Sequence, residues 1–232
     1  MEIQPIAVFH GPLSSKFGIP RQSGVVAALE GTVELLGEYA CEAAVRGLEG
    51  FDRIWLVWGF SDNRKRDWQP TVRPPRLGGN RSMGVFATRS PYRPNPLGLS
   101  AVEISGIEGT MIHVRGADLM DGTPIYDIKP YIAYADAYPE ARSGFVGQNG
   151  WKELDVDIPE DLAHRLDGIC GEGSASTVAA LLSQDPRPHY QDDPQKVYGM
   201  TYGKADVHFM VDGSQLTVTG VDRLETKKDQ TL

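Results

Sequence analysis

Short apolar runs broken by glycine and proline dominate the first 135 residues, and this pattern constrains the fold more than any other feature of the chain. Runs bounded by turn-forming residues are typical of strands. Because few helical segments lie between the runs, we expect a closed or nearly closed barrel, which removes exposed strand edges, and not a doubly wound sheet. The predicted strands are Ile3–Phe9, Gly31–Leu36, Arg53–Phe60, Met83–Arg89, Leu99–Ile107, Thr110–Arg115 and Ile125–Tyr131, with one helix at Glu42–Leu48.

A smaller C-terminal part follows a polar, glycine-rich stretch at Ala137–Asn149. Here the sequence predicts a strand at Trp151–Ile158, a helix at Ser174–Leu182 opened by a serine cap, and a hairpin within Val207–Val221. Leu166–Gly173 imitates a Rossmann glycine loop, but no buried strand precedes it, so we interpret it as a flexible connector. The predicted fold is mainly β with a small α+β appendage, and the predicted domains cover residues 1–138 and 150–226.

Several classes of protein lack their signatures in this chain. The apolar stretches are far shorter than the roughly 20 residues of a membrane-spanning helix. The five histidines and two cysteines show no metal-ligand spacing, so we expect no metal site and two reduced, buried thiols. The amino terminus carries an acidic residue, and Pro5 interrupts its apolar character, so we expect a cytoplasmic protein.

Positive charge is concentrated in one segment of an acidic protein. The formal net charge is −8, yet residues 64–93 hold eight basic residues and one acid. The remaining chain holds 15 basic and 30 acidic residues, so an anionic partner would be attracted to one place. A solvated charged loop is the alternative explanation for residues 64–66.

Three stretches combine turn-forming residues with chemically useful side chains. They read PTVRPPRLGGN from Pro70, MGVFATRSPYRPNPLGLS from Met83, and ADLMDGTPIYDIKPY from Ala117. Prolines stiffen the second stretch, which holds Tyr92, Arg93 and Asn95 on a rigid rim, as suits ligand binding. Strand alternation predicts that Ile125, Asp127, Lys129 and Tyr131 share one face, where Asp127 and Lys129 would otherwise form an ordinary surface ion pair.

These stretches, together with DPRP from Asp185, resemble the TrmO family, also called TsaA-like. The resemblance runs from Ile19 through Tyr131 and continues more loosely to Leu224. It implies a β-barrel methyltransferase that uses S-adenosylmethionine to methylate the exocyclic N6 of threonylcarbamoyladenosine beside the tRNA anticodon. It also implies a homodimer, and a C-terminal domain that assists tRNA binding.

The resemblance also implies a set of cofactor contacts. They are Ser23, Gly24 and Val25, then Ser61, Asp62, Arg89 and Leu99, and finally Ala117, Asp118, Leu119, Asp121, Gly122 and Thr123.

The implied reaction assigns roles to further residues. A ureido nitrogen is a weak nucleophile, so a base such as Asp127 or Asp121 would assist it, while Lys129 or Tyr131 would stabilise the neighbouring carbonyl. A threonyl carboxylate calls for an arginine fork such as Arg93 or Arg73. The expected substrate and phosphate contacts are Arg64, Lys65, Arg66, Arg73, Arg76, Arg81, Arg93, Asn95 and Arg187.

Two other functions use the same loops. A sensor would bind S-adenosylmethionine or a nucleotide without turnover. A hydrolase or transferase would clamp a small anionic substrate with arginines and use Asp121 or Asp127 as its base. Binding without methylation would favour the sensor, whereas tight cofactor binding would count against the hydrolase.

Overall fold

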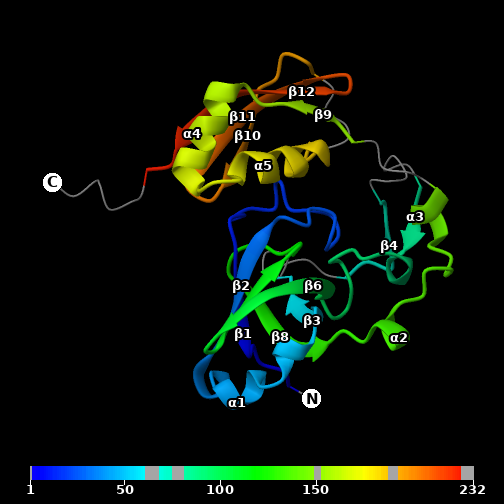
Figure 1. Ribbon diagram of the computed structural model, residues 1–232. Coiled ribbons are helices and arrows are strands. Elements are labelled where there is room, and N and C mark those ends of the chain that lie inside the picture. Colours follow the sequence, from blue (N-terminus) through cyan, green and yellow to red (C-terminus); the bar gives the residue numbers. More distant parts are fainter. Residues whose placement is uncertain (1, 61–67, 75–80, 149–152, 188–192, 226–232) are drawn as a thin grey trace. The chain divides into compact units, whose positions relative to one another are not determined.

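The computed structural model describes residues 2–60, 68–74, 81–148, 153–187 and 193–225 (Figure 1). The chain divides into two compact units. The barrel unit contains Met1–His10 and Arg21–Trp151, and the C-terminal unit contains Gly11–Pro20 and Lys152–Leu232. The second unit therefore includes a segment near the amino terminus. Among the described residues, no helix is long and apolar enough to cross a membrane.

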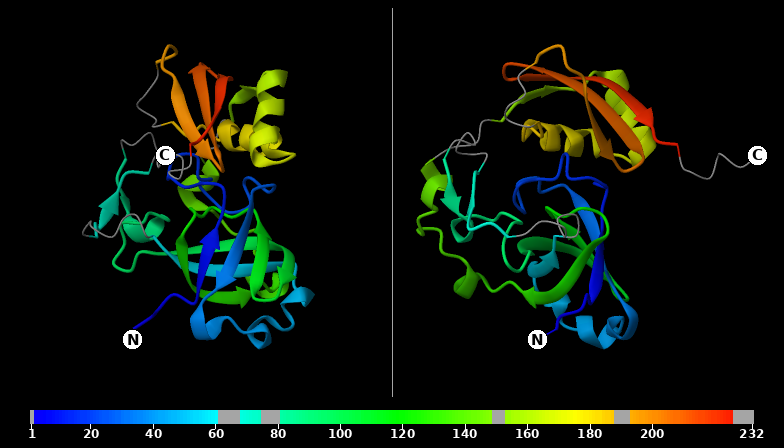
Figure 2. Two further views of the ribbon diagram at one scale, coloured as in Figure 1. Left: turned by 90° about the vertical axis from the view of Figure 1, so that its left-hand side faces the viewer. Right: turned by 180° about the vertical axis from the view of Figure 1, so that it is seen from behind.

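A closed barrel forms the body of the first unit, in the strand order β1-β2-β7-β6-β3-β8 (Figures 1 and 2). Neighbouring strands are antiparallel, and β1 pairs with β8 to close the ring. This confirms the predicted mainly β class. The strands are β1 Ala7–His10, β2 Glu30–Leu35, β3 Arg53–Gly59, β6 Leu97–Glu108, β7 Met111–Arg115 and β8 Thr123–Pro130.

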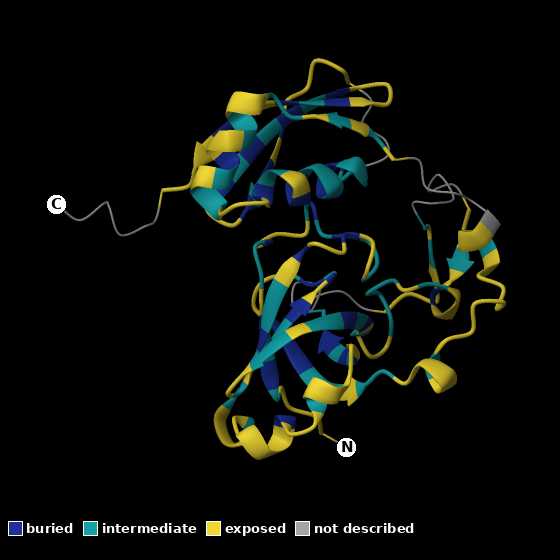
Figure 3. Cartoon of the chain, viewed as in Figure 1, coloured by how far each residue is buried: buried dark blue, intermediate teal, exposed yellow. Residues whose placement is uncertain are grey.

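Apolar side chains fill the barrel interior. Figure 3 colours the buried residues of the barrel strands dark blue. In β3, Ile54, Leu56 and Trp58 are buried and alternate with side chains that lie on the outer face. This is the period-two pattern of a strand with one buried face. A barrel of this size is filled by its own side chains and leaves no channel.

The prediction that Ile125 shares one face of β8 with Asp127 and Lys129 is wrong. Ile125 is fully buried and Ile128 packs against the same core, although three positions separate them. The register between β3 and β8 shifts at Val57/Trp58, so β8 contains a bulge that reverses the alternation of its side chains. Asp127 and Lys129 therefore lie on the outer face without Ile125.

Other differences have local causes. Strand β1 begins at Ala7 and not at Ile3, in line with the missing N–H group of Pro5. The strand expected at Met83–Arg89 is only β5 Met83–Gly84, paired with β4 Thr71–Val72. It continues as the 3-10 helix η5 Val85–Ala87, because the Thr88 hydroxyl donates to the Val85 carbonyl (2.8 Å) and closes a turn.

The remaining elements of the barrel unit are short. The expected helix at Glu42–Leu48 is shorter than predicted because Gly47 takes a left-handed conformation (φ 93°). The elements are η1 Gly37–Tyr39, α1 Glu42–Val45, η2 Leu48–Gly50, α2 Ala133–Asp136 and α3 Gly144–Gln148.

The C-terminal unit is a four-stranded sheet in the order β10-β11-β12-β9. Helices α4 and α5 cover one face of it (Figures 1 and 2). The segment Gly11–Pro20 joins this unit because Phe17 stacks on Phe209 and the Gly203 N–H donates to the Pro12 carbonyl (2.7 Å). The elements are β9 Asp155–Asp157, α4 Glu160–Cys170, α5 Ser174–Ser183, β10 Tyr198–Tyr202, β11 Ala205–Asp212 and β12 Gln215–Arg223.

Two predictions for this unit are wrong. The expected connector at Leu166–Gly173 begins inside α4, which buries Leu166 and carries acidic side chains in its first turn. The serine cap of α5 is also absent, because Gly173 occupies the cap position. The Asp167 carboxylate accepts the Ala175 N–H instead (2.8 Å). The predicted hairpin is confirmed, but its turn lies one residue later than the Asp212-Gly213 pair: Asp212 pairs with Gln215, and Gly213 and Ser214 form the turn.

The two cysteines differ from the expectation of buried thiols. Both are free, as expected, but Cys41 is exposed and Cys170 is only half-buried. Cys170 donates to the Tyr202 carbonyl, which fixes the end of α4 against β10.

Neighbouring residues on β7 provide a test of the barrel core. Ile112 is fully buried, whereas Met111 is 38% exposed. We expect Ile112→Ala to lower the free energy of unfolding by about 2–5 kcal/mol through lost apolar contacts and a residual cavity. Met111→Ala, the matched control, should change it far less. Urea unfolding followed by tryptophan fluorescence measures both, and equal losses would contradict the assigned faces of β7.

Candidate active site

Residues 21–29 approach the segment that follows β7. The Gly24 N–H donates to the Gly116 carbonyl (2.8 Å), and the Gly116 N–H donates to the Leu29 carbonyl (2.9 Å). Gly116 has a left-handed conformation (φ 74°), and a Cβ there would lie 3.3 Å from the Gly24 Cα. Only glycine meets both conditions easily. The two segments, distant in sequence, are thus held in direct contact beside Asp118.

Asp118 presents a largely buried carboxylate to several donors. Ser100 donates its hydroxyl to Asp118 Oδ1, and the Trp58 indole N–H donates to Ser100 Oγ (2.9 Å). The Ser23 N–H also donates to the carboxylate, and the Arg89 guanidinium acts on it through its charge. We call Ser23, Trp58, Arg89, Ser100 and Asp118 the Asp118 cluster.

Burial raises the pKa of Asp118 above its ordinary value of 3.8. The hydrogen bonds from Ser100, from the Asp118 backbone and from Ser23, and the charge of Arg89, all act in the opposite direction on that pKa but do not cancel the effect of burial. Perturbed carboxylates of this kind gather at functional sites, although structural networks also produce them.

Exposed apolar residues lie near members of the Asp118 cluster along the chain, and Arg89 of the cluster is basic. Val25 is 45% exposed and Leu99 is 54% exposed. Arg89 is exposed and donates to Gln22 Oε1, which ties it to the loop at residues 21–29. Ala117 and Leu119 are also predicted cofactor contacts, but their side chains belong to the barrel core. Only their backbone groups are therefore left for a ligand.

Asp121 lies in a different environment. It approaches His10 Nδ1 (3.4 Å), while His10 Nε2 approaches Glu34 (3.1 Å). The Thr123 hydroxyl donates to the Met120 carbonyl (2.6 Å) and closes the turn that contains Gly122. The structure therefore brings Asp121 to the strand pair β1 and β2, whereas Ser100 of the Asp118 cluster lies on β6.

Asp127 and Lys129 form an ion pair (2.8 Å) on the outer face of the barrel. Both are substantially exposed, as in the surface pair that the sequence allowed. Leu99 and Asp127 flank Val57 on the neighbouring strands, so Leu99 belongs to the same outer row. Tyr131 packs against the Trp55 ring, at 5.5 Å between centroids.

The predicted substrate contacts are placed unequally. Arg73, Arg81 and Asn95 are exposed. Arg93 is half-buried, and its guanidinium donates to the Thr88 (3.0 Å) and Ser90 (3.3 Å) carbonyls, so it stiffens its own loop. Arg187 is buried and doubly bonded to Asp185, which is not the exposed position expected of a phosphate contact. Ser61, Asp62, Arg64, Lys65, Arg66 and Arg76 lie outside the described residues.

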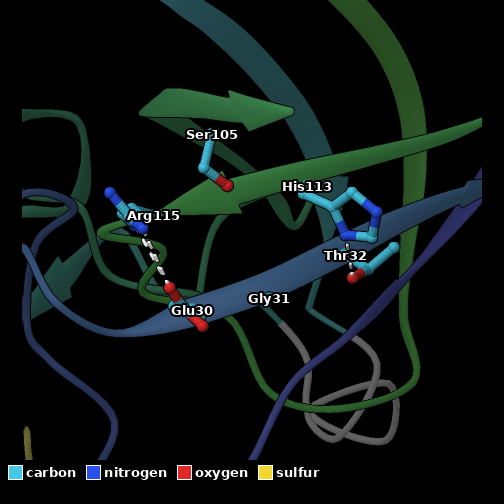
Figure 4. A pocket seen from close by; sticks show the side chains of 6 residues that line it. All are labelled: Glu30, Gly31, Thr32, Ser105, His113 and Arg115. Atoms are coloured by element: carbon cyan, nitrogen blue, oxygen red, sulfur yellow. Dashed lines mark hydrogen bonds and ion pairs between the residues drawn. The ribbon is translucent and has the colours of Figure 1, made fainter. Parts of the chain in front are cut away.

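A pocket of about 380 Å³ lies elsewhere, over β2, β6 and β7 (Figure 4). Thr32 Oγ1 contacts His113 Nδ1 (3.1 Å), and Arg115 donates to Glu30 (3.2 Å), so these polar groups already have partners. None of the predicted site residues lines it. In the described part of the chain, no group of His, Cys, Asp and Glu side chains is arranged to hold a metal ion.

Sequence reasoning missed Trp58, Ser100, Gln22 and His10. Trp58 and Ser100 lie in strands where alternation marks them as inward, and a polar serine at an inward position was the available signal. The partner of that serine lies 18 positions away in a turn, so no local pattern identifies it.

Comparison with known proteins gives a consistent relationship. A family model described as the tRNA-methyltransferase O N-terminal domain matches residues 8–137, and the TrmO C-terminal domain model matches residues 152–224. The chain is 38% identical to an Escherichia coli (strain K12) tRNA (adenine(37)-N6)-methyltransferase, over 87% of each chain. It is 40% identical to a Pseudomonas aeruginosa protein provisionally named an S-adenosylmethionine-dependent methyltransferase, over 89% of this chain and 91% of that one.

A solved structure agrees with these matches. The crystal structure of TrmO from Pseudomonas aeruginosa is similar to this chain with a TM-score of 0.79 and 32% identity. The similarity covers 96% of this chain and 98% of that chain.

The raised pKa of Asp118 predicts a change in stability with pH. Between the ordinary pKa and the raised one, the unfolded chain is ionised while the native carboxyl is protonated, so the free energy of unfolding falls as pH rises through this window. We expect the free energy of unfolding of Asp118→Asn not to fall over this pH range. Urea unfolding of both proteins at several pH values from 3 to 7 measures the difference, and parallel profiles would contradict the assigned environment.

Proposed function

The chain belongs to the tRNA-methyltransferase O family, and from this premise we propose that it is an S-adenosylmethionine-dependent enzyme that methylates N6 of adenine 37 in tRNA. The observation that carries the proposal is the match of both family domains in order, over most of the chain. Relatives with the corresponding name match most of its length at 38% identity. The barrel contributes the chemical environment described above.

The Asp118 cluster and its surroundings fit a nucleoside cofactor. A buried carboxylate accepts hydrogen bonds from ribose hydroxyls or an amino group. The Ser23 N–H donates to this carboxylate, and the Gly24 N–H donates to the Gly116 carbonyl and holds the loop in place. In this proposal the exposed Val25 and Leu99 offer apolar walls for an adenine ring. S-adenosylmethionine, when bound, supplies an electrophilic methyl group on a sulfonium. The chain itself would hold and orient the cofactor and the nucleoside, and it would accept the proton of the nucleoside.

We propose threonylcarbamoyladenosine as the modified nucleoside, and the outer face of β8 as the source of the base. Asp127 would accept the ureido N6 proton while the methyl group moves from the sulfonium sulfur to N6, so that the S–C bond breaks, the N–C bond forms and the thioether leaves. In this proposal Lys129, which is paired with Asp127, stabilises charge on the adjacent carbonyl oxygen. Tyr131, just beyond the end of β8, is the other candidate for that role. Asp121 is the alternative base, next to His10.

Exposed arginines support the proposed contacts to RNA. Arg73 and Arg81 are free to meet phosphates or the threonyl carboxylate through bidentate hydrogen bonds, and Asn95 lies on the same stiffened loop region. Arg93 serves as a positioning residue for that loop, since its guanidinium bonds to backbone carbonyls. Arg187 plays the same part in the C-terminal unit through Asp185. The basic residues 64–66 and Arg76 complete the proposed set.

We also propose that the enzyme is a cytoplasmic homodimer. The family resemblance implies the dimer, and exposed apolar side chains of the barrel unit support it: Val25, Phe86 and Leu99 are each more than two-fifths exposed. Larger exposed apolar surfaces on soluble proteins mark interaction sites. The proposed action on tRNA supports the cytoplasmic location, because the enzyme must meet its tRNA substrate there.

The decisive experiment supplies both substrates. The purified protein is incubated with S-adenosylmethionine and tRNA that carries unmethylated threonylcarbamoyladenosine, and the digested RNA is analysed by mass spectrometry. We expect a single additional methyl group on that nucleoside. tRNA lacking the threonylcarbamoyl group is the control for the finer assignment. Cofactor binding without a methylated product would contradict the enzyme assignment and favour a sensor.

Replacing the proposed base gives a second test. We expect Asp127→Asn to lower the rate at saturating substrates by about 10²–10⁴-fold, because the base is lost while binding groups remain. Glu103→Gln is the matched control, since Glu103 is also an outer-face carboxylate with an ion-pair partner, Arg53 (3.5 Å). The single-turnover methylation rate measures both. A rate within twofold of the wild-type value in Asp127→Asn would rule it out as the base.

A further inference from the structure

A directed chain of hydrogen bonds crosses the inside of the barrel end and terminates on Asp118. The Trp58 indole N–H donates to Ser100 Oγ, and the Ser100 hydroxyl donates to Asp118 Oδ1. An indole nitrogen is a donor and never an acceptor, so the Ser100 hydroxyl must accept from Trp58 and send its own proton to Asp118. The direction of the chain is therefore fixed by residue type.

The first donor of this chain is itself held in place. Trp58 is buried, packs against Phe60 with 4.4 Å between ring centroids, and lies over Gly98 of the paired strand. A Cβ at Gly98 would overlap the indole ring, so glycine is required for this approach. Ser100 is fully buried on the same strand. The donor group that meets Asp118 consequently has little freedom to turn away.

The donors around Asp118 all suit an ionised carboxylate. Ser100, the Asp118 N–H and the Ser23 N–H donate to it, and the Arg89 charge acts on it from the loop after η5. A carboxylate offers about four acceptor positions, so three donors leave room for one more. A neutral polar side chain at position 118 would also join loop 21–29 to the barrel. It would do so without the free-energy cost of burying a charge.

We propose that Ser100, oriented by Trp58, is a positioning residue that keeps the Asp118 carboxylate ionised and aimed at a hydroxyl or ammonium donor of the nucleoside cofactor. This inference rests on the proposed function and deepens it, because it assigns a positioning role in cofactor binding to a serine inside the barrel. Ser100 does not itself touch the cofactor. Its effect reaches the ligand through the charge and direction of Asp118.

The test compares two serines of β6. Ser100→Ala removes the buried donor, and Ser105→Ala, five residues further along, removes an exposed hydroxyl as the matched control. The Asp118 carboxyl pKa is measured in the unliganded protein by ¹³C NMR, and the Kd for S-adenosylmethionine is measured by calorimetry across pH. Melting temperatures establish that each variant is folded.

We expect Ser100→Ala to raise the Asp118 pKa, because the lost hydrogen bond favours the ionised form. The Kd should rise about tenfold near neutral pH, as expected for one hydrogen bond to a charged group. The pH below which binding is lost should move upward. Trp58→Phe, which leaves Ser100 in place, should shift both quantities in the same direction but less. Ser105→Ala should leave them unchanged.

Two outcomes would overturn the inference in distinguishable ways. If the wild-type protein binds S-adenosylmethionine and a folded Ser100→Ala protein binds it with the same Kd and the same pH dependence, Ser100 has no positioning role, and the proposed function stands. If the wild-type protein binds no S-adenosylmethionine, the proposed function fails and the ligand assigned to Asp118 fails with it.

Discussion

Closure of the barrel by the pairing of β1 with β8 is the constraint on which the rest of the first unit depends. Phe9 lies opposite Thr123 in this pairing, so the first and last strands of the ring meet and no strand edge is left open. The enclosed space is narrow and filled by apolar side chains. A charged pair such as Arg53 with Glu103 lies on the outer face. The Asp118 carboxylate, in contrast, is largely buried and accepts a hydrogen bond from the hydroxyl of Ser100, which is fully buried.

The segment that follows β1 belongs to the C-terminal unit and not to the barrel unit. The chain leaves the barrel after His10, passes through the C-terminal unit over Gly11–Pro20, and returns at Arg21. Phe17 stacks on Phe209, which belongs to a strand almost 200 residues later. This contact assigns a segment near the amino terminus to the core of the C-terminal unit.

The sequence predicts the parts of this molecule that rest on local periodicity. Strand β3 follows from alternation, and Gly213 marks the hairpin turn, which lies at Gly213 and Ser214 and not at the predicted Asp212-Gly213 pair. Alternation fails at β8, because a bulge is set by the register with β3 and not by the local sequence. Helix α4 was missed since its polar residues obscured the single buried position, Leu166.

The candidate site shows the same division. The motifs that indicate the family can be recognised in the sequence, and so can the possibility of an ion pair between Asp127 and Lys129. Contacts that join distant segments were not, as with the hydroxyl of Ser100 on Asp118. Arginine type alone also cannot distinguish an exposed cation such as Arg73 from one that bonds to its own loop, as Arg93 does. That difference arises only once the carbonyls of Thr88 and Ser90 are folded around the guanidinium.

The start of β6 connects the two halves of the proposed site. Leu99 and Ser100 are consecutive, so strand geometry turns one side chain outward, toward the row that contains Asp127, and the other inward, toward Asp118. The exposed Leu99 and the buried Ser100 are then two contributions of one strand: an apolar surface for the ligand, and a hydroxyl that prepares the carboxylate beneath it. The burial that raises the pKa of Asp118 lowers the stability of the native state when the group is ionised, and this is the cost expected where a fold keeps a charge ready for a ligand.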